Sequence, residues 1–126
     1  MAHQESVVCI TLPAGADLRT HQFKFVDAPA GLPTLVAATT DRTIGVLQNA
    51  PNTGEAAQIA VAGVVKVESG EAVAIGGVVK ADATGRATDV AIATTEIELG
   101  IALTASGAAG ELISVLLGAG VRGGIA

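Results

Sequence analysis

The side chains of this sequence that could carry out acid–base chemistry are few. Glu96 and Glu98 lie two positions apart, so in a strand both would point to the same side and could imitate a catalytic pair of carboxylates. General acid–base chemistry needs the two groups in different environments, usually inside a cleft. The alternation with Ile97 and Leu99 instead favours a solvated face above a buried one. We therefore expect no catalytic role for either glutamate.

The potential metal ligands and nucleophiles are equally isolated. His3 and His21 have no cluster of cysteines or carboxylates at ligand spacing around them, so we expect no metal site. Cys9 lies in an apolar run without an accompanying base, and we expect a small buried hydrophobic side chain rather than a nucleophile. Because Cys9 is the single cysteine of the chain, an intramolecular disulfide bond is excluded and a reducing compartment is compatible with the sequence.

One glycine-rich stretch matches a cofactor-binding pattern. Residues 118–123 read Gly-Ala-Gly-Val-Arg-Gly and fit G-x-G-x-x-G, which in dinucleotide-binding proteins opens a helix and is followed by an acidic residue about 20 positions later. Too little sequence follows Gly123 for such a helix. We interpret residues 118–126 as a tail that is mobile or docked on a partner, and we expect neither an enzyme nor a bound cofactor.

The composition excludes several classes of partner. The chain has 126 residues and a net charge of −5, and its scattered basic residues form no cluster for phosphates. Without Trp or Tyr it also has almost no stacking surface for single-stranded nucleic acid. No apolar run is long enough to cross a bilayer, and the N-terminus lacks the features of a signal peptide. The apolar residues are mostly small, which predicts a thin core and favours oligomerisation.

The distribution of apolar residues predicts an all-β protein. Short runs rich in Val and Ile alternate with glycine-bearing turns about every ten residues, which is typical of small barrels and sandwiches. Gly63 would form a bulge in one long bent strand, and residues 82–85 would form a hairpin turn. The expected strands are residues 6–12, 20–26, 58–67, 78–81, 86–90, 96–104 and 111–117.

One unit of the sequence occurs twice. The first copy spans residues 44–62 and the second spans residues 99–116, and each contains an apolar strand with a glycine at its second position, a turn that ends in Gly-Glu, and a second apolar strand. The first glycines are offset by 55 positions (45 to 100) and the second by 56 (54 to 110). Neither copy contains a reactive group, so the duplication predicts a scaffold of two similar hairpins.

The segment before residue 35 differs from the rest of the chain. A loop with two prolines at residues 27–33 separates an N-terminal arm, 1–34, from a compact β domain, 35–126. In the expected strand 20–26, His21, Phe23 and Phe25 would share one face. Two interpretations stay open: the two Phe side chains fill the core of the domain, or the arm lays them against another subunit.

Residues 67–87 resemble the central signature of the bacteriophage capsid decoration, or head cement, proteins. The resemblance consists of an apolar strand, Ser-Gly-Glu, a small apolar pair, Gly-Gly, a valine strand and then Asp-Ala-x-Gly-Arg-Ala at the hairpin. The strands around Gly45 and Gly100 fall where that family has its glycine-containing strands. The resemblance extends over about residues 35–121.

This resemblance implies a small β-barrel or β-tulip domain with an extended N-terminal arm. Proteins of this kind bind the outside of a phage capsid as homotrimers and stabilise the expanded shell by bridging subunits of the major capsid protein. The chain would be made in the host cytoplasm and become part of the virion, at the capsid surface. It would have no catalytic residue, cofactor or metal. Contacts to the capsid or to another subunit are expected at Ala2, His3, Gln4, Glu5, His21, Phe23 and Phe25.

Two other functions stay open. The chain could be another virion β module, such as a tail-tube component, which would polymerise by itself, or a spike component. It could also be a small ligand-binding β-barrel, although the absence of Trp and Tyr weighs against stacking on sugars.

Overall fold

The computed structural model of the chain describes residues 5–90, 92, 94 and 96–123. All regular structure in these residues is β-strand, which confirms the all-β fold expected from the sequence. The strands are β1 (Glu5–Pro13), β2 (Phe25–Asp27), β3 (Thr34–Leu35), β4 (Thr43–Leu47), β5 (Ala56–Glu68), β6 (Val78–Ala81), β7 (Ala87–Thr88), β8 (Ile97–Ala102) and β9 (Leu112–Gly123).

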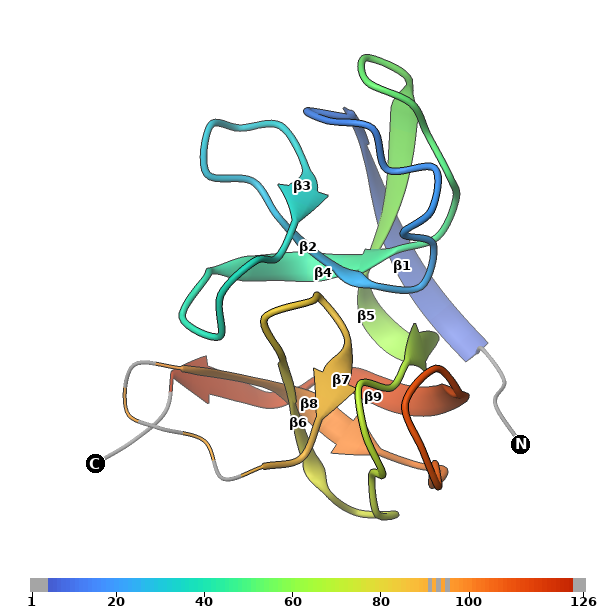
Figure 1. Ribbon diagram of the computed structural model, residues 1–126, viewed down its shortest axis with the longest axis vertical. Helices are drawn as coiled ribbons and strands as arrows, with labels where there is room; N and C mark the ends of the chain where they lie inside the picture. Colours follow the sequence, from blue (N-terminus) through green and yellow to red (C-terminus); the bar gives the residue numbers. More distant parts are fainter. Residues whose placement is uncertain (1–4, 91, 93, 95, 124–126) are drawn as a thin grey trace.

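The strands form one antiparallel sheet that curls into a half-barrel (Figure 1). The strand order is β3-β2-β4-β5-β9-β8-β6-β7, and β1 pairs with β5 outside this path. Figure 1 shows two lobes, with β1 to β4 mainly in the upper one and β6 to β9 in the lower one. The long strand β5 passes from the upper lobe into the lower one and joins them.

Two local expectations are confirmed, the strand at residues 58–67 and the hairpin turn at residues 82–85, whereas the bulge at Gly63 stays a prediction. The strand expected at residues 58–67 lies within β5, and Gly63 has φ +102°, a conformation that glycine adopts without steric cost. The pairing of β5 with β9 begins at Gly63, which lies opposite Leu117, after β5 has paired with β4 at Ile59 and Ala60. The hairpin turn expected at residues 82–85 joins β6 to β7, and Gly85 has φ +77° there.

Two other expectations are wrong. Residues 20–24 form turns, so only the end of the expected strand 20–26 is strand, as the start of β2. Residues 118–123 are not a tail but the C-terminal half of β9, paired at Arg122 and Gly123 with Glu98 and Ile97 of β8. The cofactor motif of this stretch is therefore an extended strand and opens no helix in the described residues.

The division of the chain at residue 34 stays a prediction. In the structure, the extended N-terminal segment is β1, which lies antiparallel to β5. β2 pairs with both β3 and β4. The segments on either side of residue 34 thus share one sheet.

The two lobes are structural repeats. We call β1 to β4 with residues 56–62 of β5 the first repeat, and residues 63–68 of β5 with β6 to β9 the second repeat. In the first repeat β1 pairs with β5, β5 with β4, β4 with β2 and β2 with β3. In the second, the end of β5 pairs with β9, β9 with β8, β8 with β6 and β6 with β7. The duplicated hairpin of the sequence is thus part of a duplication of the whole strand pattern.

Backbone hydrogen bonds at corresponding positions repeat as well. The N–H of Ala14 donates to the carbonyl of Glu55 at 2.8 Å, and the N–H of Ser69 donates to that of Glu111 at 2.8 Å. Farther along, Phe23 N–H donates to Leu47 and Gly76 N–H donates to Ala102, both at 2.7 Å. Phe23 and Gly76 also share a positive φ, 68° and 82°.

The core is shared unequally between the repeats. One cluster lies inside the first repeat, and a larger one fills the second repeat and includes four residues of the first. We call the contact made by these four residues the junction. They are Phe25, Val36, Val46 and Ala60, and none of them is exposed.

Candidate functional site

The residues expected to form contacts do not come together in one place. Ala2, His3 and Gln4 lie outside the described residues. Glu5 begins β1, and its backbone lies opposite Val64 of β5. As capsid or subunit contacts, all seven residues named from the sequence stay a prediction.

His21, Phe23 and Phe25 do not share a strand face. Phe23 lies in the turn before β2 with φ +68°, a backbone conformation that residues other than glycine seldom adopt. Its N–H donates to the carbonyl of Leu47 and its own carbonyl accepts from the N–H of Glu68, at 2.7 and 2.9 Å. These two bonds hold the turn against both repeats. Phe25, two positions later, is completely buried at the junction.

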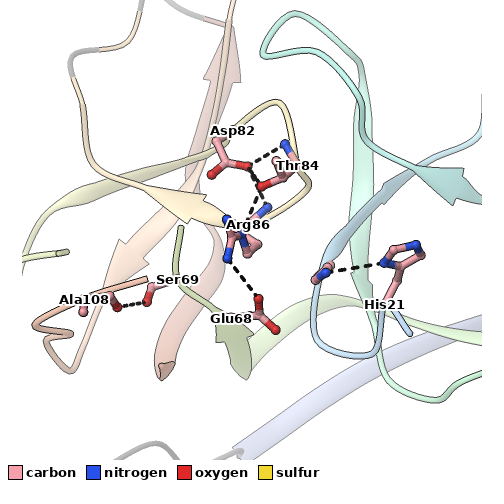
Figure 2. Close-up of polar contacts among 8 residues, drawn as sticks. His21, Glu68, Ser69, Asp82, Thr84, Arg86 and Ala108 are labelled. Carbon is pink, nitrogen blue, oxygen red and sulfur yellow. Dashed lines mark hydrogen bonds and ion pairs between the residues drawn. The ribbon is translucent and has the colours of Figure 1, made fainter. Parts of the chain in front are cut away.

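The imidazole of His21 lies beside Lys24 (Figure 2). The ammonium of Lys24 lies 3.4 Å from its Nδ1. Burial, and secondarily the charge of Lys24, lowers the pKa of His21 below its usual value. An imidazole that is neutral at pH 7 can accept a proton, but a general base also needs a substrate pocket and an orienting partner. The described surroundings of His21 supply neither.

The hairpin between β6 and β7 contains a network of polar contacts (Figure 2). Asp82 Oδ1 accepts hydrogen bonds from the hydroxyl and backbone N–H of Thr84 at 2.6 and 2.8 Å, and from the backbone N–H of Arg86 at 3.0 Å. The guanidinium of Arg86 donates to Thr84 Oγ1 at 3.0 Å and lies 3.5 Å from Glu68. The network fixes the turn so that the carbonyl of Gly85 accepts the N–H of Phe25 at 2.6 Å. The Asp-Ala-Thr-Gly-Arg segment therefore stabilises the junction.

Glu96 and Glu98 are not a pair of equivalent carboxylates. We expected a solvated Glu96, but it is buried and its Oε1 lies 2.6 Å from the ammonium of Lys80. β8 begins one residue later, at Ile97, so the strand alternation used for the expectation does not include Glu96. Cys9 is a second correction: it is exposed, because β1 covers only one edge of β5 and lies outside the main path of the sheet.

Two further acidic groups lie beside an open cleft. Asp27 and Asp41 line a cleft of about 510 Å³ together with Arg42. Burial raises the pKa of Asp27, and so does the nearby carboxyl of Asp41, against the hydrogen bond that Thr34 donates at 2.6 Å. Among the described residues no group of three His, Cys, Asp or Glu side chains could hold a metal ion. The hydrogen bonds and ion pairs of Asp82, Arg86 and Lys80 therefore stabilise turns and strand contacts.

The comparison with known families tests the resemblance to the phage capsid decoration proteins. Residues 1–117 match the family model of the phage cement proteins. The chain belongs to the phage cement protein family. This confirms the family expected from residues 67–87 and makes the chain a structural protein of a phage virion, associated with the capsid.

A solved structure supports the fold of this cement-family chain. It is similar to the N base of the head fiber protein gp8.5 of bacteriophage phi29, with 16% identity and a TM-score of 0.68. The similarity covers 94% of this chain and 99% of the other. None of the curated proteins matches the sequence. No helix in the described residues could span a membrane.

The surface of the cement-family chain exposes large apolar side chains that the sequence reasoning did not identify. Alternating strand patterns assign such residues to the core. Their exposure becomes apparent when Val78 and Val90 of the second repeat are compared with Phe25 and Val36, the corresponding residues of the first repeat. The exposed ones in the described chain are Val8, Ile10, Leu32, Ile75, Val78, Val90, Leu103 and Leu112.

Proposed function

We propose that this chain binds the outside of a phage capsid and stabilises the expanded shell by bridging neighbouring subunits of the major capsid protein. The match of residues 1–117 to the phage cement family carries this proposal. The fold is consistent with it, because the described polar groups stabilise turns and strand contacts. We further propose that the chain is not an enzyme and binds no cofactor.

The proposed mechanism is multivalent attachment. Each copy, a chain of 126 residues, would make only small contacts with the shell. On a repeating lattice several modest contacts act together, and the second contact forms at a high effective concentration. A homotrimer at local three-fold positions would give each assembly three such attachments. Bridging would then oppose the separation of neighbouring capsid subunits.

The proposed capsid contacts lie near the start of the chain. They comprise residues 2–5 and the turn that holds His21 and Phe23. His21 is half-buried and Gln22 beside it is exposed, so this turn can meet a partner without unfolding. Phe25 is completely buried and would act by holding the turn in place.

Electron microscopy of expanded capsids with and without the purified protein tests the proposal. We expect added density at local three-fold positions and a higher temperature of shell disruption. Deletion of residues 2–4 should reduce the occupancy, whereas Leu103→Asp, an exposed position outside the proposed contact, should not. Density at hexamer centres would keep the function and reject the trimer, and absence of density would reject capsid binding.

The similarity in fold to a phage head fiber base favours one alternative, a fiber or spike component. Such a component would project from the capsid at isolated positions. A cement protein would instead occupy every equivalent site of the lattice, so the same micrographs separate the two functions.

A further inference from the structure

The junction between the repeats buries one face of the first repeat. Phe25, Val46 and Ala60 lie opposite one another across β2, β4 and β5, and together with Val36 they pack into the core of the second repeat. The 82–85 turn of the second repeat packs beside this face, where the N–H of Phe25 donates to the carbonyl of Gly85 at 2.6 Å. There, Gly85 has so little space that a Cβ atom would lie 2.5 Å from Leu35 Cδ1.

The corresponding face of the second repeat is only partly covered in the described chain, since Val78 is exposed and Ile101 and Leu116 are half-buried. Val78, Ile101 and Leu116 lie opposite one another across β6, β8 and β9, in the same order as the three residues of the first repeat. Val78 is 39% exposed where Phe25 is 0% exposed. Val90 corresponds to Val36. Val90 lies two positions after Thr88, which pairs with Lys80, and Val36 lies two positions after Thr34, which pairs with Asp27. Val90 is 52% exposed and Val36 0%.

The first repeat has the complementary, unused half of such a contact. Ile10 pairs with Ile59 as Val65 pairs with Val115, yet Ile10 is 41% exposed and Val65 is completely buried. Since the strands inside the two repeats correspond, the neighbouring repeat accounts for the difference in burial.

The turn that would cover a neighbouring face is also present. In the 28–31 turn the N–H of Gly31 donates to the carbonyl of Ala28 at 3.1 Å, as the N–H of Gly85 donates to that of Asp82 at 3.2 Å. Gly31 has φ +84°, close to the +77° of Gly85, but no atom lies within 4 Å of its Cβ position. The first repeat therefore presents a turn of the same form, with no atom of the described chain packed against the Cβ position of Gly31.

We propose that copies of this chain associate head to tail, with the second repeat of one copy against the first repeat of the next, in a contact that reproduces the junction. The apolar face around Val78 and Val90 would be covered by the 28–31 turn and by β1 around Ile10 of a second copy. This is a heterologous interface, which generates a ring if the rotation closes and an open filament if it does not. The proposal goes beyond capsid binding and does not depend on it.

Sedimentation velocity of the purified full-length protein tests the proposal with three single variants. Val90→Asp alters the face of the second repeat, and Ile10→Asp alters that of the first. Leu103→Asp is the control, since Leu103 is also 39% exposed but belongs to neither face. We expect an oligomer for the unmodified chain and for Leu103→Asp, and monomers for the other two. A mixture of the two monomeric variants should give a 1:1 dimer, because each retains the half that the other has lost.

Three results would overturn the proposal. The first is a monomeric unmodified protein at the highest soluble concentration. The second is an oligomer that survives Val90→Asp or Ile10→Asp. The third is a mixture of these two variants that stays monomeric, which would show that the contact is not head to tail. Circular dichroism and thermal unfolding of each variant establish that the exposed substitutions leave the fold intact.

Discussion

Gly45 and Gly100 occupy the same place in the two repeats, each against a backbone carbonyl of the next strand. A Cβ atom on Gly45 would lie 2.2 Å from the carbonyl oxygen of Ala60, and one on Gly100 would lie 2.2 Å from that of Leu116. Ala60 and Leu116 are themselves corresponding residues, paired with Val46 and Ile101. The glycine that the sequence shows twice is therefore required by the close approach of two strands.

We expect Gly45→Ala and Gly100→Ala each to lower the free energy of unfolding by about 1–3 kcal/mol, the usual cost of forcing extra atoms into a packed site. The obstructing atom is backbone, so a side-chain rotation cannot relieve the overlap. Gly107→Ala is the matched control, since the nearest atom to its Cβ position lies 4.0 Å away. Urea titration followed by circular dichroism measures all three. Equal stability of Gly45→Ala and Gly107→Ala would contradict the packing argument.

The two hairpin glycines allow a similar comparison. Gly31 and Gly85 both have a positive φ, so alanine at either site should cost about 1–2 kcal/mol in backbone strain. Gly85→Ala should cost more than Gly31→Ala, because its Cβ would also meet Leu35 and the carbonyl of Phe25. The difference between the two losses of stability, measured by thermal unfolding, reports the packing of the junction. A larger loss for Gly31→Ala would be the opposite of what the structure requires.

Removing one side of the buried contact between Lys80 and Glu96 should destabilise the protein more than replacing both side chains together. Lys80→Met or Glu96→Gln alone should destabilise the protein by about 3–5 kcal/mol, because one buried charge loses its partner. The double variant should lose less than the sum of the two single losses. Chemical denaturation of the four proteins gives the coupling energy of this double-mutant cycle. Strict additivity would show that the two groups do not stabilise each other.

Asp27 should make the protein less stable as the pH rises. Its pKa is raised in the folded state above the usual value of 3.8, so in the pH window between the usual and the raised pKa the folded protein holds more protons on Asp27 than the unfolded chain. Stability therefore falls as the pH increases through this window. Asp27→Asn should remove the fall and raise stability at pH 7. Thermal unfolding from pH 3 to pH 7 would show this, and a steeper fall in the variant would contradict it.

His21 contributes in the opposite direction. Its pKa is lowered in the folded state, mainly by burial, so the unfolded chain binds the proton more readily. The stability that depends on neutral His21 is complete above the usual pKa of 6.5 and decreases as the pH falls below it. His21→Gln should flatten this decrease in the same unfolding series, whereas an unchanged pH profile would exclude a contribution from His21.

The hairpins could be predicted from the sequence because their glycines are fixed by geometry. Gly45 and Gly100 each lie against a carbonyl oxygen, and Gly85 has a positive φ. Each of these positions requires glycine, so the glycines can be recognised in the sequence. The full repeat could not be predicted, because most of it is a backbone pattern. Ala14 corresponds to Ser69 and Phe23 to Gly76 in their hydrogen bonds, although these side chains have nothing in common.

The candidate site was less predictable for a related reason. Strand alternation says which residues share a face but not whether a further strand covers that face. Cys9 is exposed because of the position of β1, and Phe23 adopts a positive φ that its residue type disfavours. Both outcomes depend on contacts between distant segments. The apolar surface of Val78 and Val90 is visible only by comparison with buried Phe25 and Val36.

The continuity of β5 has a mechanical consequence. Its 13 residues complete the first repeat and start the second without a connecting loop. A force that pulls the two lobes apart therefore acts along peptide bonds, and the weaker side-chain contacts between the lobes need not carry it. A protein whose two lobes share one strand can transmit tension from one lobe to the other.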